Sequence, residues 1–484
     1  MAEEQILVID EGTTSTRAML FAADGRCLGS ADREIAQSYP RPGWVEHDPE
    51  EIWLGSLGCA RHVADDGARI SAIGIANQRE TILFWNRRTG RPLGPAIVWQ
   101  DRRTADLCAR LRQAGHEPAV QAKTGLLLDP YFSASKIAWA LENWPQLREA
   151  GEDLAIGTVE SWLVFRLTGG RHVTDATNAS RTALMDIHAG RWDDGLCDLF
   201  GVPRGALPEI VDCAGDFGTT DLLGAPVKIA GLAGDQQAAA VGQVCLAPGD
   251  TKATYGTGAF VLTNTGGDAP ASKNRLLTTV AWQLGGERAY ALEGSVFVAG
   301  SVVKWLRDAI GLVATAAETE AMARSVEDNG GVYLVPAHVG LGAPHWAPDA
   351  RGAITGLSFG AGRAHVVRAA LEAMAHQTHD LMTAFAADGA AWGRLRIDGG
   401  MTANDWVAQD LADMLDLEVE RPEFVETTAL GAAMLAGVGG GLFGSLGEAA
   451  AMRGGVEHFS PAMDPNARGR RLDGWRGAIG RVLG

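Results

Sequence analysis

The chain has 484 residues, of which 46% are hydrophobic and 21% are charged, and its formal net charge is −17. This length exceeds what one hydrophobic core usually organises, so we expect two large domains. The negative charge disfavours nucleic acid and anionic membranes as partners. No run of 18 apolar residues occurs, so no membrane-spanning helix is predicted.

The start of the chain, Met1 to Glu4, is acidic and lacks the basic region of a signal peptide. The cysteines contain no C-x-x-C pair and no zinc-binding spacing. We therefore expect a cytoplasmic protein whose cysteines are reduced and buried. They are Cys27, Cys59, Cys108, Cys197, Cys213 and Cys245.

The first predicted element is a strand, a tight turn and a second strand over residues 6–21. Between the two apolar runs stand a carboxylate, a glycine and two hydroxyls, Asp10, Gly12, Thr13 and Thr14. A glycine lets backbone N–H groups approach an anion, and a carboxylate suits Mg²⁺. The turn therefore indicates nucleotide phosphate and magnesium, although an ordinary hairpin turn has a similar composition.

The next elements alternate between strand-like and helix-like patterns, which favours an α/β domain. A helix is predicted to start at Asp48, and strands are predicted over 70–76 and 81–85. Arg79 and Glu80 stand between these strands. Their donors and acceptors suit vicinal hydroxyls, and they suit a surface ion pair equally well.

Three further residues are candidates for a substrate pocket. Trp99 and Tyr131 stand beside polar groups, although such aromatic residues are more often part of a core. Asp235 follows the apolar run 229–233 and precedes a helical pattern. An Asp at this place can act as general base towards a hydroxyl, or it can cap the helix.

The second half of the chain repeats the first pattern about half a chain later. A Gly/Thr turn at Thr254–Gly258 lies between apolar runs and predicts a second phosphate-binding hairpin, unless the similarity is chance. A strand over 395–397 ends at two glycines and precedes a helix over 404–415, and a helix of small residues is predicted over 427–436. Ligands often bind at such strand-to-helix junctions.

Two common nucleotide motifs are excluded. No Gly-Lys dipeptide occurs, so the usual P-loop is absent, and the G-x-G-x-x-G pattern at 439–444 follows a helix instead of a strand. Two facing hairpins instead favour a cleft between two lobes. We place the boundary near residue 245, which gives domains 1–245 and 246–484.

The motifs resemble those of the FGGY carbohydrate kinases, and they cover nearly the whole chain. The resemblance implies two RNase H-like lobes with an interdomain catalytic cleft, an α/β architecture shared with actin, hexokinase and the Hsp70 ATPase. The matching stretches are DEGTTSTRA (10–18), PGWVEHDPEEIW (42–53), GIANQRET (74–81), AIVWQDRRTA (96–105), TGLLLDPYFSASK (124–136), DATNASRTAL (175–184), AGDQQAA (233–239), TYGTGAF (254–260), ALEGSVFVAG (291–300) and DGGMTAND (398–405).

Within that family, the motifs are most similar to those of members that act on glycerol. This implies phosphorylation of glycerol to sn-glycerol 3-phosphate by ATP with Mg²⁺, with Asp235 as the base and Asp10 near the metal. The implied polyol contacts are Arg79, Glu80, Trp99, Tyr131, Asp235, Gln236 and Phe260. The implied nucleotide contacts are Thr13, Thr14, Ser15, Arg17, Thr257, Gly300, Lys304, Gly400 and Asn404.

Three alternatives stay open at this point. The substrate could be another small polyol or ketotriose, such as erythritol or dihydroxyacetone. A nucleotide-driven binding protein with actin-like lobes would hydrolyse ATP without a polyol, and an inactive relative would act as a scaffold. A homo-oligomer, dimer or tetramer, is expected, although the sequence does not give the oligomeric state.

Five residues depart from the family pattern, and none of them is an implied polyol contact. Glu11 stands where relatives have Gln, and alternation along a strand would turn its charge away from the phosphates. Glu160 replaces Asp, and Lys304 replaces Gln. His345 and Ala347 replace Tyr and Asp.

Two regulatory devices of relatives are not expected here. Some relatives bind fructose 1,6-bisphosphate through an arginine-bearing loop, but the corresponding stretch 217–226 contains no Arg or Lys. Others are activated by phosphorylation of a loop histidine, and no histidine occurs between His188 and His338.

Overall fold

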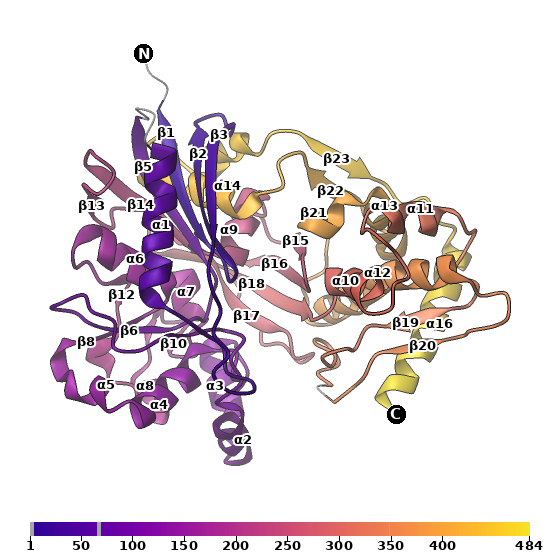
Figure 1. Ribbon diagram of the computed structural model, residues 1–484, viewed down its shortest axis with the longest axis horizontal. Coiled ribbons are helices and arrows are strands. Elements are labelled where there is room, and N and C mark those ends of the chain that lie inside the picture. Colours follow the sequence, from indigo (N-terminus) through magenta and orange to yellow (C-terminus); the bar gives the residue numbers. More distant parts are fainter. Residues whose placement is uncertain (1–3, 65–68, 348) are drawn as a thin grey trace.

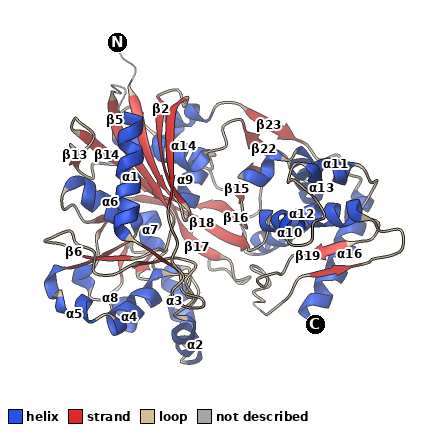
Figure 2. Cartoon of the chain, in the orientation of Figure 1, coloured by secondary structure: helices blue, strands red, loops and turns tan. Residues whose placement is uncertain are grey.

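The computed structural model describes residues 4–64, 69–347 and 349–484 (Figure 1). Met1, Ala2 and Glu3 of the acidic start lie outside these residues. The described chain forms two α/β bodies, each built on a mixed β-sheet covered by helices (Figure 2). This confirms the predicted fold class of two similar lobes.

The first sheet has a parallel centre and an antiparallel edge within the described residues. β1 pairs in parallel with β5 and antiparallel with β2, while β5 pairs in parallel with β14. In spatial order the strands are β13 (Thr219–Thr220), β14 (Val227–Gly234), β5 (Ile70–Asn77), β1 (Gln5–Glu11), β2 (Ser15–Ala22) and β3 (Cys27–Glu34).

The second sheet repeats this pairing scheme. β15 pairs antiparallel with β16 and in parallel with β21, and β21 pairs in parallel with β22. The echo predicted from the second Gly/Thr turn is therefore confirmed as a repeat of topology. In spatial order the strands are β17 (Leu277–Leu284), β18 (Glu287–Val296), β16 (Ala259–Gly266), β15 (Asp250–Tyr255), β21 (Arg394–Asp398), β22 (Val419–Pro422) and β23 (Val456–Phe459).

Short strands complete the described β-structure. They are β4 (Glu46–His47), β6 (Leu83–Asn86), β7 (Ala96–Ile97), β8 (Leu154–Gly157), β9 (Val173–Asp175), β10 (Met185–Asp186), β11 (Arg191–Trp192), β12 (Glu209–Val211), β19 (Tyr333–Val335) and β20 (Ala353–Thr355). The strand predicted over 81–85 starts later, as β6, because the N–H of Thr81 donates to the carbonyl of Arg79 at 2.8 Å and closes a turn there.

The α-helices of the described residues are α1 (Pro49–Ala64), α2 (Ala105–Gln113), α3 (Glu117–Thr124), α4 (Ser133–Asn143), α5 (Pro145–Glu149), α6 (Val159–Thr168), α7 (Ala176–Ser180), α8 (Asp194–Phe200), α9 (Asp235–Gly242), α10 (Gly300–Asp308), α11 (Glu318–Arg324), α12 (Arg363–Ala387), α13 (Asp405–Leu415), α14 (Thr427–Gly439), α15 (Leu446–Ala449) and α16 (Pro465–Leu483). As predicted, Asp48 caps α1, accepting the N–H of Glu50 at 2.9 Å. Each of these helices is too short or too polar to cross a membrane.

Alternation along β1 turns successive side chains to opposite faces of the first sheet. Leu7 and Ile9 pack beneath α1, while Ile6 and Val8 join a core with α14 on the other face. The helix α14 comes from the second half of the chain, so both halves build the first body (Figure 1). The boundary predicted near residue 245 falls between α9 and β15 and stays a prediction.

The cysteine prediction holds with one correction. All six cysteines lie within the described residues and are free, and five of them are buried. Cys27 is exposed, because it begins the edge strand β3, whose residues face solvent on most positions.

Candidate active site

The first Gly/Thr turn connects β1 to β2, as predicted. The N–H of Gly12 donates to the carbonyl of Ser15 at 3.0 Å, which closes the turn. Thr14 is exposed at its tip, and the Thr13 hydroxyl accepts the indole N–H of Trp99 at 2.9 Å. The turn is therefore joined directly to the aromatic residue predicted beside the polyol.

The two acidic residues before this turn point in different directions. Burial, and next the charges of Asp235 and Glu426, raise the pKa of Asp10 to about 7, while the Arg17 charge lowers it. Glu11 is buried on the other side, where the Ser56 hydroxyl of α1 donates to it at 2.7 Å. The expectation that Glu11 faces away from the phosphate turn is confirmed.

The predicted polyol residues meet at the carboxyl ends of two parallel strands. Asn77, the last residue of β5, pairs with Gly234, the last residue of β14. Arg79 follows the first strand by two residues, and Asp235 follows the second directly. Parallel strands present their carboxyl ends at one edge, so the topology brings residues distant in sequence together.

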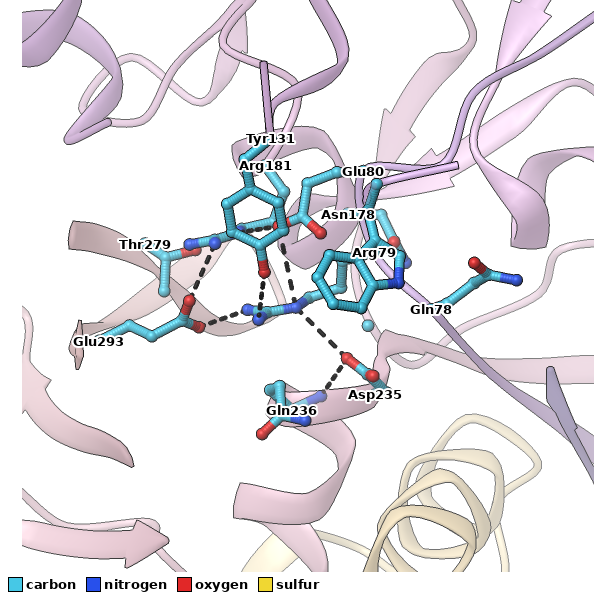
Figure 3. Close-up of polar contacts among 12 residues, drawn as sticks. Gln78, Arg79, Glu80, Tyr131, Asn178, Arg181, Asp235, Gln236, Thr279 and Glu293 are labelled. Carbon is cyan, nitrogen blue, oxygen red and sulfur yellow. Dashed lines mark hydrogen bonds and ion pairs between the residues drawn. The ribbon is translucent and has the colours of Figure 1, made fainter. Parts of the chain in front are cut away.

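Arg79 is the centre of this group (Figure 3). Its Nε lies 3.3 Å from Oδ1 of Asp235, and its Nη2 donates to the Tyr131 hydroxyl at 3.5 Å. Its Nε is also 4.0 Å from Oε1 of Glu80. Arg79 and Glu80 are buried, whereas the Asp235 side chain is one-third exposed at 33%. Asp235 thus has open space on one side and a guanidinium on the other.

The backbone at Glu80 has a conformation that few residues other than glycine adopt. Its φ is +62°, in the left-handed region. Such a conformation costs of order 1–3 kcal/mol and persists only where the surroundings fix it. Here the fixing contact is the bond from Nε of Arg181 to Oε1 of Glu80, 2.6 Å long. The surface ion pair considered for Arg79 and Glu80 is excluded, because both are buried.

The Asp235 cap interpretation holds only in part. Gly234 occupies the N-cap of α9, and Asp235 is the first helical residue. Its Oδ1 accepts the N–H of Gln236 at 2.7 Å. The other carboxylate oxygen is left for a ligand, so a local hydrogen bond and a chemical role are compatible.

Aromatic side chains form the wall beside this group. The rings of Trp99 and Tyr131 pack edge to face, with centroids 5.6 Å apart. The Lys136 ammonium donates to the carbonyls of Pro130, Tyr131 and Phe132, which fixes the loop that carries Tyr131. Sequence reasoning did not single out Lys136.

The second body contributes to the same site from its sheet. Phe260 lies on β16 opposite Thr254 of β15. The buried Lys252 donates to the side-chain oxygen of Gln236 and to the Thr254 hydroxyl, the latter at 2.9 Å. Lys252 is a second positioning contact that the sequence did not indicate.

Of the predicted nucleotide residues, those of the second body lie around the second hairpin and the junction after β21. The N–H of Gly256 donates to the carbonyl of Gly258 at 2.9 Å, which leaves Thr257 exposed at the tip. A Cβ on Gly300 would meet the carbonyl oxygen of Gly256 at 2.6 Å, so only glycine fits there. Lys304 is exposed one turn along α10.

A cavity of about 610 Å³ opens at the junction after β21. Its lining includes Gly399, Gly400, Arg421 and Glu426. Asn404 lies near it as the N-cap of α13 and accepts the N–H of Trp406 at 3.0 Å. Its side-chain oxygen is thus already bonded within the helix.

Arg17 is already paired in this structure. Its Nη1 lies 2.5 Å from Oε2 of Glu426, and the two side chains are 33% and 40% exposed. The prediction placed Arg17 at the transferring phosphate. A phosphate there would compete with Glu426 for the same guanidinium.

The remaining departures lie away from the polyol group. Glu160 is buried and accepts the hydroxyls of Thr158 and Thr174, each at 2.6 Å. His345 lies 3.3 Å from Asp380, and Ala347 packs on a small core near α16.

Sequence reasoning missed two buried charged residues next to Arg79. Arg181 caps the end of α7, and Glu293 lies within the apolar strand β18. Both stand in stretches that resemble the family, yet neither received a role. A single charge inside a buried apolar strand was the available signal.

These features define a two-lobed phosphotransferase, and the comparisons name its family. Residues 5–242 match the N-terminal domain of the FGGY family of carbohydrate kinases, and residues 251–440 match its C-terminal domain. The chain belongs to the FGGY family of carbohydrate kinases. A glycerol kinase of Methylobacterium nodulans is 58% identical over 99% of this chain and 98% of its own length. One of Rhodospirillum centenum is 55% identical over the same shares.

Solved structures agree on the fold. The glycerol kinase of Plasmodium falciparum with ADP superposes with a TM-score of 0.95 at 36% identity, covering 100% of this chain and 99% of that one. A gluconate kinase of Lactobacillus acidophilus has a TM-score of 0.89 at 20% identity, covering 99% and 98%, and shows the fold alone.

Proposed function

We propose that this kinase transfers the γ-phosphoryl group of ATP to a terminal hydroxyl of glycerol and releases sn-glycerol 3-phosphate and ADP. The observation that carries the proposal is the buried polar group around Arg79, which faces one partly exposed carboxylate, Asp235. The full-length similarity to glycerol kinases supports the choice of glycerol.

The polyol side of the site would work by hydrogen bonding and shape. Arg79 and Glu80 would hold vicinal hydroxyls, with Tyr131 and Gln236 as further polar contacts. Trp99 and Phe260 would cover the carbon chain. Because the guanidinium and carboxylate are already fixed by neighbours, little conformational entropy is lost when the substrate binds.

Asp235 would accept the proton of the attacking hydroxyl as general base. Thr13, Thr14, Ser15 and Arg17 on one hairpin would contact the transferring phosphate. The opposite residues would hold the rest of the nucleotide; they are Thr257, Gly300, Lys304, Gly400 and Asn404. Closure of the two bodies would exclude water that otherwise hydrolyses ATP.

The residues present fit a magnesium ion beside the phosphates. Asp10 is a half-buried carboxylate next to the first turn, and the nearby charges of Asp235 and Glu426 disfavour its ionised form. A cation balances such a cluster, and Mg²⁺ usually takes one or two carboxylates plus phosphate oxygens. When bound, Mg²⁺ would neutralise charge on the phosphoryl oxygens.

The proposal is tested by ADP release with glycerol, dihydroxyacetone and erythritol offered separately. We expect glycerol to give the highest kcat/KM. Preference for another polyol would replace the substrate, a polyol-independent rate would favour the nucleotide-driven binding protein, and no turnover would favour the scaffold.

The Asp235→Asn variant is expected to fold normally and to lose at least about a hundredfold in kcat, because general bases typically contribute 10²–10⁴-fold. Asp216→Asn, an exposed carboxylate in a turn, is the matched control and should retain full turnover. Near-normal kcat in Asp235→Asn would remove the base assignment.

Three broader features belong to the same proposal. We place the domain boundary near residue 245, and we propose a homo-oligomer, dimer or tetramer, which light scattering would test. Because the reaction consumes ATP, we propose that it takes place in the cytoplasm.

A further inference from the structure

Four buried charged side chains form a closed group behind the polyol residues. They are two guanidinium groups, Arg79 and Arg181, and two carboxylates, Glu80 and Glu293, each no more than 3% exposed. Buried charges are costly unless they are paired and hydrogen-bonded. In this group each carboxylate contacts both arginines, as Figure 3 shows.

Glu293 is the member of the group that comes from the second body. Its Oε2 accepts a bond from Nη1 of Arg79 at 2.5 Å, and its Oε1 accepts one from Nη2 of Arg181 at 2.9 Å. It lies on β18, next to the strand that carries Phe260. The polyol-binding arginine of the first body is thus fixed by the sheet of the second body.

The charges explain why two carboxylates are needed. Burial alone would raise the pKa of Glu293, but Arg181 and Arg79 outweigh it and hold that pKa below its ordinary value. The pKa of Glu80 is raised instead, because burial there outweighs the charges of Arg181 and Arg79. Of the two carboxylates, Glu293 is therefore the one whose ionised form the two guanidinium groups favour more strongly.

Arg79 also reaches the general base, with Nε 3.3 Å from Asp235. Glu293 and Glu80 face the same guanidinium within the buried group, and its Nη1 also donates to the side-chain oxygen of Gln237 at 3.3 Å. Without Glu293, two adjacent guanidinium groups would retain only Glu80 within the buried group. Arg79 would then be drawn more strongly towards Asp235.

We propose that Glu293, seated on Arg181, is a positioning residue that holds Arg79 in its polyol-binding orientation and limits the attraction of Arg79 for Asp235. The inference rests on the proposed function, since it assigns Arg79 to the polyol and Asp235 to the proton. It gives a role to the motif at 175–184 and to Glu293 in the motif at 291–300, of which the proposed reaction otherwise uses Gly300.

The test is a kinetic comparison of Glu293→Gln with the wild type. We expect KM for glycerol to rise by about tenfold or more, because Arg79 loses a buried, charged hydrogen-bond partner. KM for ATP should stay within about twofold of the wild-type value. Glu293→Gln should also lower kcat, because an Arg79 held closer to Asp235 occupies the carboxylate that is proposed to receive the proton.

The matched control is Glu372→Gln. Glu372 is likewise a buried glutamate beside two arginines, 2.9 Å from Arg368 and 3.6 Å from Arg471, but it lies in the second body away from the polyol group. It should lower the melting temperature without changing KM for glycerol or kcat. Glu293→Asp keeps the charge and should restore KM for glycerol and kcat towards their wild-type values.

The outcomes separate this inference from the proposed function. If the wild type releases no ADP with glycerol, the proposed function fails, and the comparison is made with the polyol that does support turnover. If the wild type is active and Glu293→Gln matches Glu372→Gln in glycerol KM and kcat, the positioning role is wrong.

Discussion

Glu160 is a buried carboxylate with one oxygen fully bonded and the other without a hydrogen-bond partner. Burial, and next the neighbouring charge of Asp175, raise its pKa to about 8. The folded protein therefore holds a proton there that the unfolded chain, with an ordinary Glu pKa near 4.5, releases at lower pH. This contribution to stability is fully present below pH 4.5 and is lost as the pH rises towards 8.

The Glu160→Gln variant should flatten this dependence, because an amide offers the same acceptor to Thr158 and Thr174 and does not ionise. The free energy of unfolding of the variant, relative to that of the wild type, should increase from pH 5 to pH 8.5. We expect this increase to be on the order of a few kcal/mol. Urea unfolding at the two pH values measures the difference. The exposed Glu149→Gln variant serves as the control. If the free energy of unfolding changed equally with pH in both variants, the raised pKa would not belong to Glu160.

Arg17, which we propose contacts the transferring phosphate, forms an ion pair with Glu426 in the wall of the cavity of about 610 Å³. Exposed ion pairs are worth about 0.2–1 kcal/mol. The Glu426→Gln variant is therefore expected to lower KM for MgATP by up to about fivefold, with KM for glycerol unchanged. Glu423→Gln, which changes another carboxylate in the same cavity wall, is the control. A higher KM for MgATP in Glu426→Gln would show that Glu426 contributes to binding instead.

The residues predicted for the polyol site were accessible from sequence because each stands in a recognisable motif at a strand end. Arg181 and Glu293 could not be predicted in this way, because their role depends on contacts with residues 101 to 214 positions away along the chain. A lone glutamate in an apolar strand signals a buried partner, but it does not say which arginine is the partner.

At the scale of elements, the packing of α14 on α9 depends on glycines, which have no side chain. A Cβ on Gly431 would overlap the carbonyl oxygen of Ala238, and a Cβ on Gly242 would overlap that of Thr427. The two helices thus approach closely through glycine. Since Asp235 is the first residue of α9, their spacing also sets the position of the proposed base.

The Gly431→Ala variant should force the two helices apart. We expect a loss of about 1–3 kcal/mol in stability, as overpacking produces, and a fall in kcat because Asp235 moves with α9. Thermal unfolding and ADP release measure the two effects. Gly477→Ala in α16, where a Cβ meets open space, is the control and should be neutral or stabilising. Normal stability in Gly431→Ala would contradict this view of the interface.

Hairpins and helix starts were predictable from local chemistry, because a Gly/Thr turn between apolar runs and an Asp before Pro-Glu-Glu fix their own geometry. The beginning of β6 was not, because the turn that precedes it needs a left-handed backbone at Glu80, which is not a glycine. This turn overrides strand propensity at that point.

At the scale of the whole molecule, the repeated hairpin predicted two similar lobes, and the two sheets confirm the repeat. Sequence order suggested two contiguous halves, but α14 packs across that division onto the first sheet. The sequence of a helix of small residues does not indicate which sheet the helix covers. The packing of α14 on the first sheet was therefore visible only in the structure.

This crossing has a consequence for biosynthesis. The strands β1, β5 and β14 are complete once residue 234 has been translated, but the helix that covers one of their faces ends at residue 439. A nascent chain therefore leaves the ribosome with Ile6, Val8 and Phe21 unshielded by their final partner. The first body is finished only after most of the second has been made.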